Sequence, residues 1–368
     1  MTERLSQLLA GEADGLDVPP PTPGAVIREG RGMRRRHRMV VGACGVAAAL
    51  VVGGSVAALA GGGNDTAAPD PAGSPGSAAP VFSYGNQVFY DGPAQSAPVE
   101  DKAVKSLFYS SAGVVVRAGD NSWSDGGGEQ RFSLITPDGD VRRLSLVTEE
   151  TVHASDPDQP YVVYGEEVGG NLEVVVYDVQ ADAEAARVTV APTEDHWFPV
   201  SIDGDTVYVQ NGYDNGVYAV DWRSGKVQES DLSSVWEVAG GHAGVTVAGK
   251  AAVVDTATGD VLLTADGPGY FDLSPDGRYA QLVSEDQQGS PTSKVYAVAS
   301  GSSITVDGDP FSWGWTADGD LFTVEDSDVR TCDVATGDCS TAPFDAPGTP
   351  GSDKEAPELR LGGRAYES

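Results

Sequence analysis

The sequence predicts an all-β domain, a six- or seven-bladed β-propeller, preceded by one transmembrane helix. Three observations lead to this prediction. From Val81 onward, short runs of β-branched and aromatic residues alternate with Asp-Gly and Thr-Gly turns, and no helix-period run of useful length occurs. Two kinds of hairpin alternate, and the turns of one kind recur at intervals of 33 to 43 residues, the length of a four-stranded propeller blade. Finally, residues 39–61 form an uninterrupted uncharged stretch.

The N-terminal part is divided by composition. Residues 1–38 carry seven arginines and five acidic residues, and we assign them to a cytoplasmic segment. Residues 39–61 are 23 uncharged residues, about 34 Å as a helix at roughly 1.5 Å per residue, which is enough to span a bilayer. Because positive charge stays on the cytoplasmic side, the arginines place the N-terminus inside and the remainder outside the plasma membrane.

One alternative for this segment is cleavage and secretion. Ala58-Leu59-Ala60 fits a small-x-small cleavage site, so a secreted protein cut near Ala60 stays open, although the apolar run exceeds the usual signal-peptide length. Small residues recur every four positions from Gly45 to Gly61, which also leaves open a weak transmembrane dimer.

The remaining chain divides into three parts. Residues 62–80 have the composition of a disordered linker, with almost no bulky apolar side chain. Residues 81–346 are the predicted extracytoplasmic propeller, and residues 347–368 a C-terminal tail. Beyond residue 61 the chain carries 16 basic and 50 acidic residues, which excludes nucleic acid as an expected partner and favours basic or cation-bridged partners.

The first kind of hairpin begins with Ser or Thr and contains Asp-Gly, as at 201–209, 274–282 and 316–324. Asp-Gly supplies the positive φ angles of a two-residue hairpin turn. The second kind follows the pattern V-Y-x-V-x-x-x-x-G-x-V, with turns near residues 138, 181, 224, 257, 300 and 336. Together they predict six blades over residues 103–343. Residues 81–91 either complete the last blade by pairing the two ends of the chain or belong to a degenerate seventh blade.

The turn Ser274-Pro-Asp-Gly-Arg-Tyr279 resembles the S-P-D-G-[KR] turn of TolB-type β-propeller repeats, relatives of the WD-repeat propellers. The resemblance covers roughly residues 100–343, and Gly241-His242 is similar to the Gly-His of WD repeats, without the Trp-Asp dipeptide. It implies a propeller architecture and specifies no ligand.

No local motif predicts catalysis, a cofactor or a metal site. Residues 244–251 nearly match a phosphate-binding loop, but Ala251 replaces the magnesium-binding Ser/Thr and the segment lies between strands. His153, His196 and His242 are isolated in sequence, and acidic turns such as Asp156/Asp158 match no twelve-residue calcium loop.

Two sets of residues remain as site candidates. Cys332 and Cys339 flank a four-residue turn and are predicted to face each other across a hairpin, within disulfide range in an oxidising exterior. Aromatic residues recur just before the inner strands, where they either pack between blades or form a ligand face: Trp197, Tyr270, Trp313 and Trp315.

The function that this reasoning favours is non-catalytic binding of a protein or cell-envelope ligand. The alternatives are an extracytoplasmic propeller enzyme, a hydrolase or lyase, and a transmembrane signalling protein. A cluster of His, Asp, Glu or Arg at one mouth of the channel would favour the enzyme.

Overall fold

The computed structural model describes part of the chain, and all of it lies in the second of two compact units, Pro69–Ser368. The described residues are 79–121, 128–212, 216–232, 235, 237–265, 269–284, 290–325, 327–346 and 358–364. The predicted cytoplasmic segment, the transmembrane helix at 39–61 and nearly all of the linker lie outside them. In the described part, no helix is both long and apolar enough to cross a membrane.

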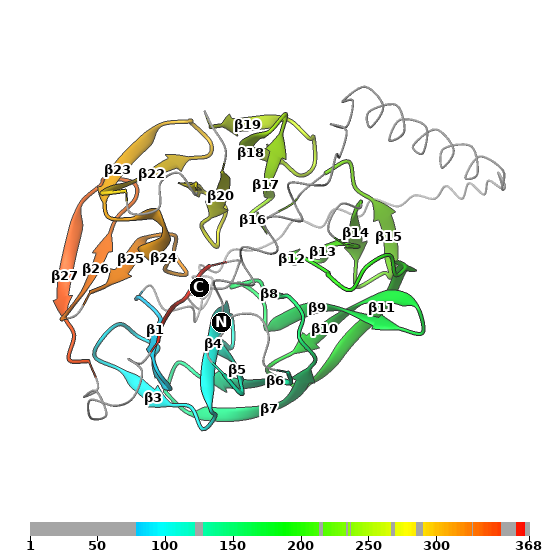
Figure 1. Cartoon of the computed structure of the whole chain (residues 1–368), viewed down its shortest axis with the longest axis horizontal. Helices are drawn as coiled ribbons and strands as arrows, with labels where there is room; N and C mark the ends of the chain where they lie inside the picture. Colours follow the sequence, from blue (N-terminus) through cyan, green and yellow to red (C-terminus); the bar gives the residue numbers. More distant parts are fainter. Residues whose placement is uncertain are drawn as a thin grey trace, which may run out of the picture. The chain divides into compact units, whose positions relative to one another are not determined.

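Seven four-stranded antiparallel sheets form a ring around a central channel (Figure 1). The all-β prediction is confirmed, and of the two blade numbers that the sequence left open, the structure has seven. We number the blades 1 to 7 and name the strands of each from the innermost outward.

The strands of blades 1 to 4 are as follows: β4 (Ala103–Ser110), β5 (Gly113–Gly119), β6 (Gln130–Ile135) and β7 (Val141–Thr148); β8 (His153–Ser155), β9 (Tyr161–Val168), β10 (Asn171–Asp178) and β11 (Ala183–Pro192); β12 (Val200–Asp203), β13 (Thr206–Gln210), β14 (Val217–Asp221) and β15 (Lys226–Glu229); β16 (Glu237–Ala239), β17 (His242–Val247), β18 (Lys250–Asp255) and β19 (Val261–Thr264). Those of blades 5 to 7 are β20 (Tyr270–Leu273), β21 (Tyr279–Val283), β22 (Thr292–Ala297) and β23 (Ser303–Asp307); β24 (Gly314–Trp315), β25 (Leu321–Val324), β26 (Asp328–Cys332) and β27 (Cys339–Pro343); β28 (Leu359–Leu361), β1 (Phe82–Tyr84), β2 (Gln87–Phe89) and β3 (Ser96–Pro98). A 3-10 helix, Pro310–Ser312, precedes β24.

The Asp-Gly turns join the inner strand of a blade to the next strand, but they are not all two-residue turns. In blade 3, Asp203 pairs with Thr206 and the loop is Gly204-Asp205. In blade 5 the loop is longer, since the last paired residues are Leu273 and Ala280. Within it, Gly277 donates its N–H to the Ser274 carbonyl at 2.8 Å and adopts a φ of +69°. Glycine fits this left-handed position without strain, so the longer loop places the aspartate rather than the glycine at the tip of a local turn.

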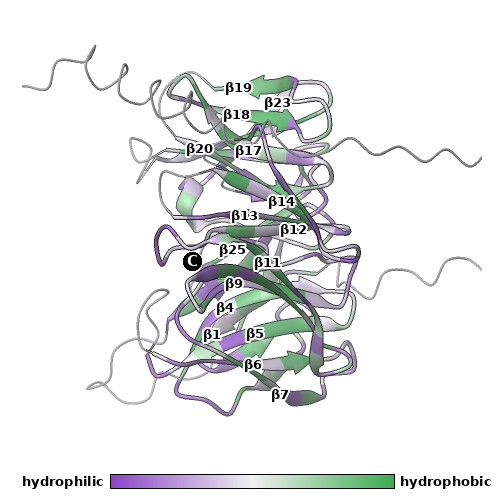
Figure 2. Ribbon diagram, turned by 90° about the vertical axis from the view of Figure 1, so that its right-hand side faces the viewer, coloured by the Kyte–Doolittle hydropathy of each residue, from purple (hydrophilic) through white to green (hydrophobic). Residues whose placement is uncertain are grey.

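The hydrophobic core is divided among the spaces between neighbouring blades. One cluster joins blades 2 and 3, another blades 5 and 6, and a third blades 6 and 7. Seen from the side, hydrophobic residues follow the strands and hydrophilic residues gather mostly at the turns (Figure 2). Each sheet therefore buries both faces, which explains the nearly continuous apolar runs of the inner strands.

The seventh blade is built from both ends of the described chain. Phe82, Ser83 and Tyr84 of β1 pair with residues 361, 360 and 359 of β28, and β28 lies innermost. The assignment of 347–368 to a tail is therefore wrong for residues 359–361. The sequence did not reveal this strand because three residues are too few to show a period, and pairing with a segment more than 270 residues away leaves no local signal.

Candidate functional site

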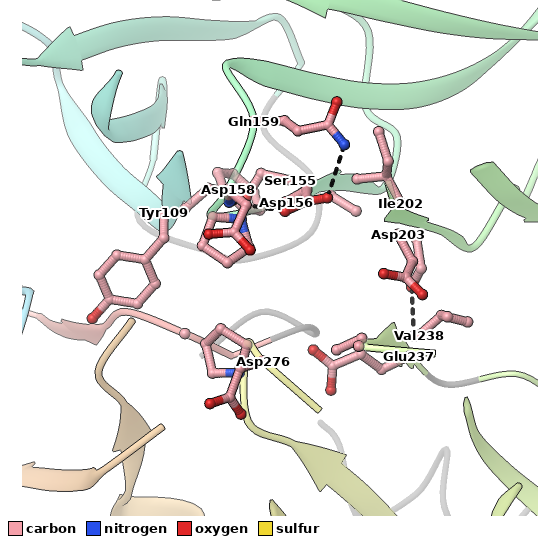
Figure 3. Close-up of a pocket in the computed structure, with 18 of the residues that line it drawn as sticks. Tyr109, Ser155, Asp156, Asp158, Gln159, Ile202, Asp203, Glu237, Val238 and Asp276 are labelled. Atoms are coloured by element: carbon pink, nitrogen blue, oxygen red, sulfur yellow. Dashed lines mark hydrogen bonds between the residues drawn. The ribbon is translucent and has the colours of Figure 1, made fainter. Parts of the chain in front are cut away.

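A cavity of about 330 Å³ lies at the mouth of the central channel, where the inner strands end (Figure 3). Six of the seven blades contribute to its wall with residues of the inner strand or of the segment that follows it. These segments are Leu107–Tyr109, His153–Gln159, Val200–Gly204, Glu237–Gly240, Pro275–Asp276 and Gly363–Arg364. The ring geometry thus brings together residues that are separated by up to 257 positions in the sequence.

Most of the carboxylates at this mouth hold neighbouring blades together. Asp156 of blade 2 accepts a hydrogen bond from the backbone N–H of Gly204 in blade 3, at 2.9 Å. Asp203 of blade 3 accepts one from the N–H of Gly241 in blade 4, at 2.8 Å. In both contacts the aspartate of one blade accepts from the backbone N–H of a turn glycine in the next blade, which gives these carboxylates a structural use.

Asp158 differs from these residues. Its side chain lies exposed at the mouth, and among the described residues no hydrogen bond or ion pair to its carboxylate is found. Partial burial, together with the negative charges of Asp156 and Asp276, raises the pKa of the Asp158 carboxyl. Carboxylates that repel each other in one hollow create a negative potential that attracts a cation.

A second acidic group lies deeper, on the inner strands of blades 4 and 5. Glu237 accepts a hydrogen bond from the backbone N–H of Leu273 at 2.8 Å, and Asp272 accepts one from the Trp315 indole N–H at 3.1 Å. Burial, with the charge of Asp272 as the next cause, raises the pKa of Glu237 well above its ordinary value. At neutral pH this carboxyl therefore holds its proton more readily than an exposed glutamate does.

Arg364 is the arginine among the residues that line the cavity. It follows β28 and is half-buried, and its Nη1 donates to the carbonyl oxygen of Phe311 at 2.9 Å. Its guanidinium also lies within hydrogen-bond reach of the Tyr270 hydroxyl, whose pKa is raised mainly by burial.

The candidate ligand-face aromatics do not line this cavity. Trp313 and Trp315 are completely buried and pack between blades 5 and 6, so of the two predicted alternatives they follow packing between blades and form no ligand face. Trp197 is half-buried and packs against the core of blades 2 and 3. Tyr270 is half-buried beside Arg364 and is not among the lining residues. Periodic placement before each inner strand produces packing between blades because every blade presents the same position to its neighbour.

The histidines are held apart by the fold. His153 is buried in blade 2 with Nε2 3.0 Å from the Thr148 hydroxyl, and burial lowers its pKa so that it stays neutral. His196 is exposed, with Nδ1 2.8 Å from a carboxylate oxygen of Glu167, and His242 contacts the Gly277 carbonyl from blade 4. Within the described ranges, no three His, Cys, Asp or Glu residues are grouped so as to hold a metal ion.

The near-match to a phosphate-binding loop is a hairpin. Its residues belong to β17 and β18, which pair from His242/Asp255 to Val247/Lys250 around the turn Ala248-Gly249. A phosphate-binding loop needs a following helix whose N-terminal N–H groups face the phosphate, and here a strand follows instead.

Cys332 and Cys339 form a disulfide at the start of the outer hairpin of blade 6. They are directly paired residues of β26 and β27, with their Cα atoms 4.0 Å apart. Cys332 is buried in the core between blades 5 and 6, so the bond ties the outermost strand of this blade to the core.

The sequence indicated some of these site residues only indirectly. The acidic turn with Asp156 and Asp158 is visible in the sequence, whereas Glu237, Asp272 and Arg364 are not among the predicted site residues. Glu237 and Asp272 do carry a signal, because an acid within an otherwise apolar inner strand is costly to bury and so points to a specific role. Arg364 had no such signal, since nothing local shows that it enters the channel.

The comparisons with known proteins show that this chain resembles solved structures in fold alone. No protein-family model matches the sequence, and no curated protein matches it. Solved structures do match: apo AztD from Citrobacter koseri has a TM-score of 0.49 at 12% identity over 78% of this chain and 98% of that one. TolB from Acinetobacter baumannii has a TM-score of 0.42 at 14% identity over 62% of this chain.

The present chain spans 64% of that TolB chain. The β-propeller domain of Cps50 (Swd1) from Myceliophteria thermophila also matches, with a TM-score of 0.42 at 14% identity over 66% of this chain and 87% of that one. At these identities the similarity concerns the arrangement of strands, and the chain is similar to TolB-type and WD-repeat structures as a seven-bladed β-propeller.

Proposed function

We propose that this protein is a membrane-anchored extracytoplasmic β-propeller that binds a protein or cell-envelope ligand without chemical conversion. A cationic group of the ligand enters the cavity at the channel mouth. The observation that carries the proposal is Asp158, an exposed carboxylate in the cavity wall to which no described residue supplies a counter-cation. Partial burial and the charges of Asp156 and Asp276 raise its pKa. An incoming ammonium or guanidinium relieves this repulsion, which makes binding of a cation favourable.

The chain as a whole supports the same preference. Its net charge of −32 attracts basic partners over distances of about a Debye length, roughly 10 Å at 0.1 M salt. Attachment through residues 39–61 would hold the propeller close to the membrane and so raise its local concentration there. Protease added to intact spheroplasts is expected to degrade the propeller and leave an epitope within residues 1–38 protected. Digestion of that epitope in intact spheroplasts would contradict the topology.

The binding experiment uses the full chain and a lysine tetrapeptide blocked at both ends, which carries only positive charge. We expect saturable binding that weakens as salt rises from about 0.05 to 0.5 M, because screening reduces the attraction. Asp158→Asn should weaken it several-fold. Asp260→Asn is the matched control, since this exposed carboxylate lies at an outer turn of blade 4, away from the cavity. Equal losses in both variants, or no binding at all, would refute the proposal.

A second candidate, a hydrolase or lyase, is favoured by the feature named for it from the sequence, because Asp, Glu and Arg side chains gather at one mouth of the channel. The cavity wall contains Glu237, whose raised pKa would suit a general acid, with Asp272 beside it. Both carboxyls are committed to hydrogen bonds from Leu273 and Trp315, which limits their freedom to act on a substrate. Turnover of an ester, peptide or glycoside by the full chain that is lost in Glu237→Gln would establish catalysis and overturn the binding proposal.

A further inference from the structure

Arg364 is held in the cavity wall by the way the chain closes the ring. The N–H of Gly362 donates to the Val81 carbonyl at 2.8 Å, and the Gly362 carbonyl accepts from the Trp315 N–H at 3.2 Å. Gly363 has a φ of +72°, and a Cβ atom on it would lie 2.4 Å from the Trp315 carbonyl oxygen. The backbone before Arg364 is thus fixed on both sides, which holds the start of this side chain at the cavity wall.

The Arg364 guanidinium has more N–H donors than the described residues around it use. Arginine has five N–H donors, and the contacts of Arg364 with described residues are those to the Phe311 carbonyl and the Tyr270 hydroxyl. Within the described part of the chain, no carboxylate lies within 4.0 Å of it, although several acids line the same cavity. A half-buried arginine without an ion-pair partner, beside a hollow, has the chemistry of a carboxylate-binding group.

A ligand that carries only negative charge does not suit the cavity beside Arg364. Asp158, Asp276 and Glu237 line the same cavity, and the carboxylates among them repel any ligand with only negative charge. A ligand that carries both signs avoids the conflict, because its ammonium meets the acidic mouth while its carboxylate meets Arg364.

We propose that the cavity binds a zwitterionic ligand, with an ammonium and a carboxylate a few bonds apart, and that Arg364 receives the carboxylate. This inference rests on the proposed function and specifies its ligand class. The cavity volume of about 330 Å³ is near the lower end of the usual range for ligand pockets, about 300–1,000 Å³. It therefore suits either a free amino acid with a second amino group or the C-terminal lysine of a polypeptide, which share this chemistry.

The test compares matched probes on the full chain by titration calorimetry: 6-aminohexanoate, hexylamine and hexanoate. We expect the zwitterion to bind about ten-fold more tightly than the amine, as one added charge-assisted hydrogen bond provides, and hexanoate not to bind. If a polypeptide end is the ligand, tetralysine with a free C-terminus should bind more tightly than its amidated form. If the ligand is small, free lysine should bind more tightly than both.

Variants of Arg364 then identify the group responsible. Arg364→Gln should reduce the affinity for 6-aminohexanoate to that for hexylamine, and Arg364→Lys should restore part of the difference. Arg360→Gln is the control, because Arg360 lies on β28 in the same segment, outside the cavity wall. Equal binding of zwitterion and amine to the unmodified chain would overturn this inference and leave the proposed function standing. Failure of every amine probe to bind would overturn both.

Discussion

The carboxylate of Asp203 in blade 3 accepts a hydrogen bond from the backbone N–H of Gly241 in blade 4, at 2.8 Å. The same relationship joins Asp156 of blade 2 to Gly204 of blade 3. In blade 6, a Cβ atom on Gly319 would lie 3.2 Å from the carboxylate oxygens of Asp276 in blade 5. In these three places an aspartate of one blade lies against the turn of the following blade, and the two hydrogen bonds connect neighbouring blades at the channel mouth.

Replacing Asp203 should destabilise the ring. Asp203→Ala leaves the N–H of Gly241 without this partner, and we expect the free energy of unfolding to fall by about 1–3 kcal/mol. Asp205→Ala serves as the control, since Asp205 forms an exposed ion pair with Arg223 that is worth about 0–1 kcal/mol. Denaturant unfolding of the full chain measures both. Equal effects of the two substitutions would show that the bond between blades contributes no more than a surface ion pair.

The disulfide should protect both of its cysteines from thiol reagents. In a Cys44→Ala chain that has not been reduced, we expect no titratable thiol, and two after reduction under denaturing conditions. Replacing Cys332 and Cys339 together by alanine should cost about 2–3 kcal/mol at most, because the bond closes a short loop. Two reactive thiols in the oxidatively purified chain would contradict the bond and weaken the extracytoplasmic assignment.

Glu237 should make the folded state less stable as pH rises. Its pKa in the folded state lies well above the ordinary value of 4.5, so the folded chain binds this proton more tightly than the unfolded chain does. The stabilisation is fully present below pH 4.5 and is lost as pH rises through the folded pKa.

Glu237→Gln removes this titration and keeps a similar shape. As pH rises from about 4.5, the parent should therefore lose unfolding free energy relative to the variant. Unfolding midpoints measured at intervals from pH 5 to pH 8 test this. A difference that stays constant across the range would show that Glu237 titrates as it does in the unfolded chain.

Removal of the C-terminal strand should open the ring. A chain ending at residue 357 lacks β28, which leaves the inner edge of β1 unpaired and uncovers Phe82 and Phe322, the apolar neighbours of Leu361. We expect a lower and broader thermal transition and concentration-dependent association, because unpaired strand edges promote aggregation. A chain ending at residue 364 keeps β28 and Arg364 and should melt like the full chain. Indistinguishable melting of the two truncated chains would mean that β28 contributes little to closure.

Local chemistry made much of this architecture predictable. Strands and turns follow from short-range preferences: alternating β-branched residues favour extended backbone, and Asp-Gly tolerates the positive φ of the connecting turns. The spacing of 33 to 43 residues then indicates a blade, and the Cys332/Cys339 pairing follows from a hairpin in which both positions are only seven residues apart.

The candidate site could not be predicted in the same way. Asp158, Glu237 and Arg364 lie on blades 2, 4 and 7, and they share a cavity only because the ring closes. Whether an aromatic such as Trp313 packs in the core or faces a ligand depends on the neighbouring blade, which no local pattern identifies.

The sequence alone therefore determined the strands, their turns, the repeat length and the strongly acidic charge, since each depends on residues close together in the chain. The tertiary structure decided that there are seven blades, that residues 359–361 form an inner strand, and that Arg364 enters an acidic cavity. These features depend on contacts between distant segments, whose free energy comes from burial and pairing across the closed ring.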